Sequence, residues 1–203
     1  MSKANKKANS FRLTSLGILT ALVIVLQIFT TFVHFGPFSI TLALIPIVVG
    51  AAMFGPGAGA YLGAVFSVIV VIMSALGGDP GGFMVWSANP IMCIVLCMAK
   101  GTFAGFEAGV HYRALESKNK IVASVTAAIV SPIVNTGIFV LGMMIFFKDT
   151  LAVWANGTDI ILYIIFGLTG INFLIELGVN IVLSPVVVQI VDAGRKTKLG
   201  NAE

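Results

Sequence analysis

Six apolar runs, separated by short clusters of glycine, proline, asparagine and charged residues, dominate this 203-residue chain. Hydrophobic residues make up 58% of the sequence and charged residues 10%, whereas a soluble domain carries roughly 25% charged residues. A helix needs about 20 apolar residues to cross a bilayer. The sequence therefore predicts an all-α integral membrane protein, a bundle of six transmembrane helices in a single domain over residues 1–203. The expected spans are 11–33, 40–54, 58–76, 89–112, 120–147 and 159–192.

The basic residues between these runs predict an orientation. Ten of the twelve Lys and Arg residues fall in the N-terminal tail, the loop after the fourth span and the C-terminal tail. With six spans these segments share one side of the membrane, so the positive-inside rule predicts cytoplasmic termini. The first run is about twice as long as a signal-peptide core and lacks a cleavage site, so we expect a retained span. No nucleic-acid partner is expected, because the cations flank spans and form no basic face with aromatics.

The sequence offers no catalytic or metal-binding constellation. Cys93 and Cys97 are four residues apart in an apolar run without acidic or histidine neighbours, which indicates two buried small apolar side chains. His34 and His111 are expected on opposite sides of the membrane, which excludes a shared metal ion. The chain has no Walker A motif for ATP. We therefore expect no enzyme activity, no metal and no cofactor.

Polar side chains inside the apolar runs are candidate binding residues, because they are costly at membrane depth. Asn89, Asn135 and Asn172 are expected between the outer surface and the midplane, where a pocket open to the outside would reach. The outer stretch GGDPGGFMVWSANP reads as a flexible loop that ends in aromatic residues, which suits a cover over a small polar molecule. Its Trp86, like Trp154 in the last outer loop, could equally be a headgroup anchor.

Three further polar residues have competing interpretations. Lys100 is expected about 18 Å into the fourth span. It could form an ion pair with Glu176, or it could extend toward the cytoplasmic headgroups. Glu176 and Asn180 lie deeper than Asn172 on the same helical face, and a structural role is expected for both.

Small residues recur at helical spacing in three runs. Gly59, Gly63 and Ser67 form one ladder in the third span, and Gly101, Gly105 and Gly109 form another in the fourth; both are expected to pack helices within the bundle. The first run carries a small-residue stripe at steps of four, three and four, which would let a helix of another protein approach closely. This stripe consists of Ser10, Thr14, Gly17 and Ala21.

The chain resembles the substrate-binding S components of energy-coupling factor (ECF) vitamin transporters, from about residue 12 to residue 190. The resemblance rests on the six predicted spans, the small-residue stripe and three phrases: ALIPIVVGAAMFGPGAGAYLGAVFS, NPIMCIVLCMAKGTFAGFEAGVHYRAL and SPIVNTGIFVLGMMIFF. It implies a multi-pass protein of the bacterial plasma membrane that binds a small vitamin. It also implies two kinds of partner, a transmembrane coupling subunit and, through it, two cytoplasmic ATPases.

The resemblance further implies roles for particular residues. Gly17, Ala21 and Val25 match the first-helix motif that contacts the coupling subunit, although that motif usually has alanine where Gly17 stands. The vitamin is expected in the outer half of the bundle, under the first, third and fifth loops. The candidate substrate-binding residues are His34, Phe38, Phe83, Trp86, Asn89, Lys100, Asn135, Phe139, Trp154 and Asn172.

Among the subfamilies the chain looks most similar to the group that contains the pantothenate, folate and riboflavin binders. We favour pantothenate or a pantetheine-like molecule, because aliphatic positions face the expected pocket and Lys100 could receive a carboxylate. One alternative is a stand-alone secondary transporter of a small polar metabolite, although neither an internal repeat nor a set of coupling-ion residues is visible. Another is a structural protein without a ligand.

Overall fold

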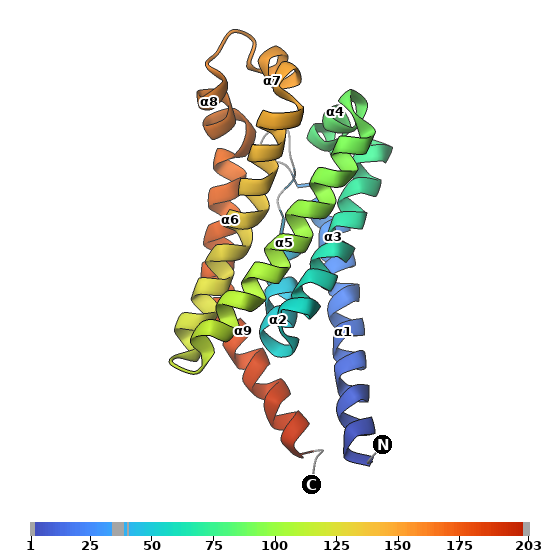
Figure 1. Cartoon of the computed structure of the whole chain (residues 1–203), viewed down its shortest axis with the longest axis vertical. Helices are drawn as coiled ribbons and strands as arrows, with labels where there is room; N and C mark the ends of the chain where they lie inside the picture. Colours follow the sequence, from blue (N-terminus) through green and yellow to red (C-terminus); the bar gives the residue numbers. More distant parts are fainter. Residues whose placement is uncertain (1–2, 34–38, 40, 201–203) are drawn as a thin grey trace.

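The computed structural model describes residues 3–33, 39 and 41–200, and this part of the chain is almost entirely helical (Figure 1). The expected all-α class is therefore confirmed. Both ends of the chain lie at one end of the molecule, and α4, α7 and α8 lie at the other. The helices are α1 (Lys3–Thr30), α2 (Leu44–Phe54), α3 (Pro56–Leu76), α4 (Pro80–Ala88), α5 (Pro90–Glu116), α6 (Lys120–Phe146), α7 (Lys148–Ala155), α8 (Ile160–Leu162), the π-helix η1 (Tyr163–Thr169) and α9 (Gly170–Gly200).

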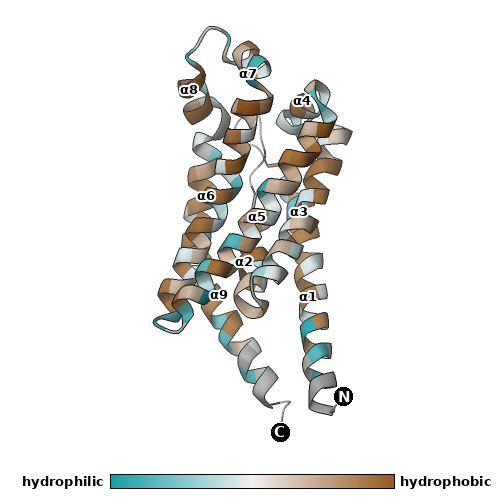
Figure 2. Ribbon diagram, viewed as in Figure 1, coloured by the Kyte–Doolittle hydropathy of each residue, from teal (hydrophilic) through white to brown (hydrophobic). Residues whose placement is uncertain are grey.

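Five helices are long and apolar enough to cross a membrane, and a sixth span results if the α7–α8 pair counts as one. The five spans are Asn9–Thr30, Pro56–Leu76, Pro90–Glu116, Lys120–Phe146 and Asn172–Gly194. Hydrophobic residues predominate along the middle of these helices, with a few hydrophilic residues on α5 and α6, and hydrophilic residues are more frequent near the ends of the molecule (Figure 2). This distribution matches a bilayer around the middle of the bundle.

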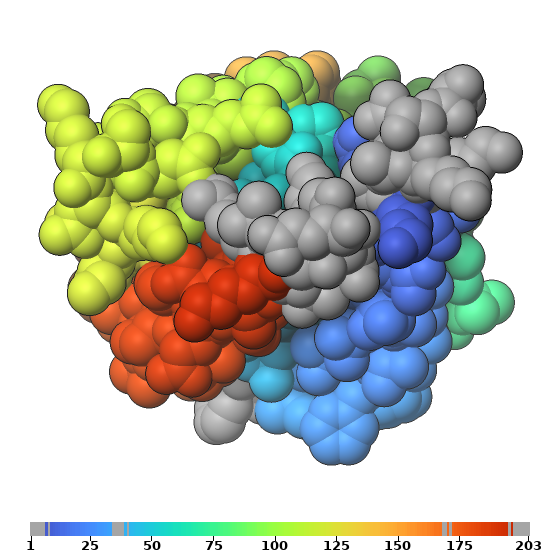
Figure 3. All heavy atoms as spheres, turned by 90° about the horizontal axis from the view of Figure 1, so that it is seen from below, coloured from blue at the N-terminus to red at the C-terminus, as the bar shows by residue number. Residues whose placement is uncertain are grey.

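Helix α2 is shorter than a span but lies in the centre of the bundle. Its Leu44, Ile47, Val48 and Ala51 are almost fully buried, and they join an apolar cluster that includes Val23 and Val191 from the first and last helices. Figure 3 shows the end of the molecule that holds both termini, with α1 (blue), α9 (red) and the α5–α6 turn (yellow-green) around α2 (cyan). The second apolar run, predicted as a span over residues 40–54, therefore forms a short helix that is buried in the centre of the bundle.

The outer stretch after α3 is helical, so the expectation of a flexible loop there is wrong. Asp79 accepts a hydrogen bond from the backbone N–H of Gly82 and thereby caps α4, and Pro80 occupies the first helical turn. An acidic cap followed by proline is a strong helix start, and it outweighs the two glycines that follow. The outer stretch 148–159 likewise contains α7, which ends where Asn156 adopts a left-handed conformation with φ of 46°.

The last run also differs from the expected continuous span. Residues 163–169 are π-helical, and α9 begins only at Gly170. A Cβ at Gly170 would collide with the carbonyl oxygen of Ile165, five residues earlier, so glycine permits this wider helical turn. The segment Ile160–Gly167 is bent by 88° relative to α7.

The two glycine ladders of α3 and α5 pack against each other, as the spacing predicts. A Cβ at Gly59 would collide with the Gly105 carbonyl oxygen, and a Cβ at Gly63 would collide with that of Gly101. The backbones of α3 and α5 therefore meet directly, which is the packing expected of small residues in a membrane. This contact also fixes the position of Lys100, the residue immediately before Gly101.

Candidate functional site

The described residues enclose a polar cavity of about 40 Å³ between α1, α3, α5 and the segment that leads into α2. Hydroxyl, amide, carboxylate and ammonium groups all reach its wall, so it offers both donors and acceptors to a ligand. Met73 and Val70 of α3 supply its apolar side. The complete lining is Gln27, Thr31, Ser39, Thr41, Val70, Met73, Asp79 and Lys100.

Lys100 is the positive group of this site. Its Nζ lies 5.0 Å from the centroid of the Phe139 ring, a cation–π contact that joins α5 to α6. The side chain reaches the cavity wall that includes Asp79, at the α4 end of the bundle. The Lys100 side chain therefore lies inside the bundle and extends toward the α4 end, away from the end that holds both termini.

Glu176 joins α9 to the wall of the cavity, a connection that the sequence interpretation did not anticipate. Its Oε1 accepts a hydrogen bond from the Thr41 backbone N–H at 2.8 Å, and its side chain is buried. Asn180, one turn further along, donates from Nδ2 to the Glu176 carbonyl oxygen at 2.8 Å. The only sequence signal for Glu176 was its spacing of four residues from Asn172 on one face of the helix.

Asn135 and Asn172 are both buried, on the neighbouring helices α6 and α9. Lys120 Nζ lies 2.6 Å from Asp192 Oδ1 near the far end of the same helix pair. Counting equal rises from that contact along two antiparallel helices places Asn135 at the level of Glu176. Within the described part of the chain, Asn135 Oδ1 is a buried acceptor without a hydrogen-bond partner, and Asn135 does not line the cavity.

Three of the aromatic candidates pack against the same apolar cluster. Trp86 of α4, Trp154 of α7 and Phe139 of α6 all pack against one apolar cluster. The cluster contains the free, buried thiols of Cys93 and Cys97, as their spacing predicts. Three elements that are far apart in the sequence thus contribute aromatic side chains to one apolar cluster.

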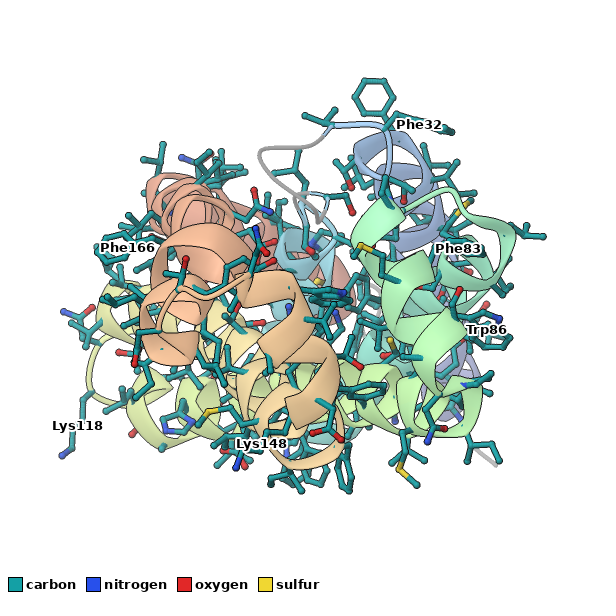
Figure 4. All side chains as sticks on the ribbon, turned by 90° about the horizontal axis from the view of Figure 1, so that it is seen from above. Phe32, Phe83, Trp86, Lys118, Lys148 and Phe166 are labelled. Atoms are coloured by element: carbon teal, nitrogen blue, oxygen red, sulfur yellow. The ribbon has the colours of Figure 1, made fainter. Side chains whose placement is uncertain are left out.

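The remaining candidates lie elsewhere. Phe83 is 46% exposed, and Figure 4 shows it with Trp86 on the α4 side of the molecule, across from Phe166. Asn89 is exposed, and its Oδ1 accepts a hydrogen bond from the Met92 N–H at the start of α5. His34 and Phe38 lie outside the described residues.

A second surface lies on α1. All four residues of the small-residue stripe are exposed, and a Cβ at Gly17 would have no heavy atom within 4 Å. Val25, one step beyond Ala21, is 62% exposed. Beside this stripe, an apolar groove of about 520 Å³ runs between α1, α2 and α9, with Ile18 and Leu22 on its wall. The exposed stripe and the neighbouring apolar groove together form one continuous surface along α1.

Among the described residues, no group of three or more His, Cys, Asp or Glu side chains could hold a metal ion. The chain matches a family model described as the substrate-specific component of ECF transporters over residues 11–188. It is also 25% identical over 191 residues to the pantothenic acid transporter PanT of Lactococcus lactis subsp. cremoris (strain MG1363), with 90% of this chain and 94% of that protein covered.

Proposed function

Because the chain belongs to the family of substrate-specific components of ECF transporters, we propose that its substrate is pantothenate or a pantetheine-like molecule. The observation that carries this proposal is the ammonium group of Lys100 at the wall of a polar cavity inside an apolar bundle. A lysine at this depth is costly unless it serves a pairing or binding role. The similarity to a protein named as a pantothenic acid transporter supports the same substrate.

Pantothenate combines a carboxylate with an amide, two hydroxyl groups and a branched aliphatic portion, and residues in and near the cavity offer a complement for each. The cavity of about 40 Å³ has to widen to admit a molecule of this size, which would bring Asn135, Phe139 and Trp154 into contact with it. Lys100 would receive the carboxylate in a charge-assisted hydrogen bond. The free acceptors Gln27 Oε1 and Asn135 Oδ1 would accept from the amide and hydroxyl groups. Phe139 and Trp154 would cover the aliphatic portion with their rings.

The exposed stripe of α1 supports a coupling role. Gly17, Ala21 and Val25 present a smooth surface on which a helix of the transmembrane coupling subunit would pack. The ATPases bound to that subunit would supply the energy, since the chain has no Walker A motif. In this arrangement both termini face the cytoplasm of a bacterial cell and the cavity faces outward, as the basic residues favour.

Two measurements test the proposal. The chain is purified in mild detergent, co-purified small molecules are identified by mass spectrometry, and pantothenate binding is measured by calorimetry. We expect binding near one molecule per chain, and an absence of binding would refute the proposed substrate.

Uptake is then measured in vesicles that contain the chain with an ECF energising module. Ala21→Leu is expected to retain pantothenate binding but to lose ATP-dependent uptake, whereas Val153→Leu, which changes an exposed apolar residue at the other end, retains both. Accumulation of pantothenate by the chain alone, without ATP, would favour the secondary-transporter alternative.

A further inference from the structure

Two buried carboxylates from distant helices hold the short segment that precedes α2. Glu176 of α9 binds the Thr41 N–H at 2.8 Å, and Asp79 at the start of α4 binds the Ser39 N–H through Oδ1 at 3.0 Å. Both carboxylates and Thr41 are less than 10% exposed. Ser39, Thr41 and Asp79 all line the polar cavity, so the two hydrogen bonds lie in its wall.

The Asp79 carboxylate is placed by the backbone of α4. Its Oδ2 accepts from the Gly82 N–H at 2.8 Å, which leaves Oδ1 directed at Ser39. A Cβ at Gly82 would collide with Asp79 Oδ2 and with Ser74 Oγ, so only glycine lets the carboxylate lie this close. The residue therefore does more than cap a helix, because its second oxygen links α4 to the cavity wall.

Burying a carboxylate costs free energy unless donors and an opposite charge compensate it. At Glu176 the compensating donor is the backbone N–H of Thr41. Because Thr41 lines the cavity, the hydrogen bond that attaches it to Glu176 lies at the ligand site.

We propose that Asp79 and Glu176 are positioning residues, which fix the backbone at Ser39 and Thr41 as one wall of the substrate site and so slow the departure of bound substrate. Neither residue is assigned a contact with the substrate. The substrate part of this inference rests on the proposed function, whereas the attachment of Ser39 and Thr41 does not.

The attachment is tested by hydrogen exchange of the full-length chain in detergent without ligand, with overlapping peptides that isolate the amides of Ser39 and Thr41. Glu176→Leu is expected to speed exchange at Thr41 by about tenfold or more, because the acceptor of its N–H is removed. Glu176→Gln keeps an acceptor oxygen and is expected to keep slow exchange. Gly178→Ala is the matched control on the same helix, since its Cβ would meet no atom within 4 Å.

Asp79→Ser provides an independent variant. Serine is a good helix cap, so α4 is retained, but its hydroxyl is too short to reach Ser39 as well. Exchange at Ser39 is expected to rise by about tenfold while that in α4 stays slow. This variant decides the inference if Glu176→Leu does not fold. Unchanged exchange at Ser39 in Asp79→Ser, or at Thr41 in a folded Glu176→Leu, would overturn the proposal.

The substrate part is tested by the dissociation rate of radiolabelled pantothenate. Glu176→Leu is expected to release it about tenfold faster than Gly178→Ala does, whereas equal rates would refute the positioning role. If the unmodified chain binds no pantothenate, the proposed substrate is wrong. The exchange at Ser39 and Thr41 then still decides the attachment by itself.

Discussion

The contact between α3 and α5 predicts a sharp difference between two Gly→Ala substitutions. At Gly63 a Cβ would collide with the carbonyl of Gly101, which is backbone and can yield only if one helix moves. At Gly137 of α6 a Cβ would meet no heavy atom within 4 Å. Both changes raise helix propensity by the same amount, so that contribution cancels when the two variants are compared. Overpacking then leaves Gly63→Ala less stable than Gly137→Ala by about 1–3 kcal/mol.

The chain contains its own probes for this measurement. Cys93 and Cys97 are 1% and 6% exposed, so a thiol-reactive fluorophore labels them only when the bundle opens. Unfolding in mixed micelles with increasing SDS, followed by this fluorophore, gives the free energy of unfolding of each variant. Equal free energies for Gly63→Ala and Gly137→Ala would refute direct backbone contact between α3 and α5. Gly63→Ala is also expected to weaken pantothenate binding, because Lys100 adjoins the displaced Gly101.

Three other predictions concern charged side chains. Lys100→Met is expected to weaken pantothenate binding by about tenfold or more in calorimetry, because a charge-assisted bond is lost, whereas Lys118→Met leaves it unchanged. Lys118→Cys and Lys148→Cys are expected to react with a membrane-impermeant maleimide from opposite sides in oriented vesicles; labelling from one side would contradict the topology. Asp192→Asn removes a partly exposed ion pair with Lys120 and is expected to lower the free energy of unfolding by less than about 1 kcal/mol, measured in the same SDS titration.

Much of the helical framework follows from local sequence. Apolar runs bounded by Gly, Pro and charged residues predict long helices, since backbone groups in a membrane must be satisfied within the segment. The spacing of Gly59 and Gly63, and of Gly101 and Gly105, also predicts close helix packing, which the structure confirms between α3 and α5. The exposure of Gly17 matches a stripe with no partner inside the chain, but its coupling role stays a prediction.

Only the tertiary structure decided which carboxylates bind the backbone that forms the wall of the cavity. The Glu176–Thr41 hydrogen bond joins residues 135 positions apart, and its donor is a backbone N–H that every residue except proline has. No sequence pattern can single out such a donor. Asp79 was visible only as part of a glycine-rich stretch, and its carboxylate finds Ser39 because α4 forms and directs it there. The sequence by itself indicated most of the long apolar helices, because hydrophobicity and helix length are local properties, but it did not indicate that residues 44–54 form a short buried helix or that the last run is interrupted at residues 163–169. The pairing of Lys100 with Phe139, and of the two carboxylates with the segment before α2, depended on packing between distant helices.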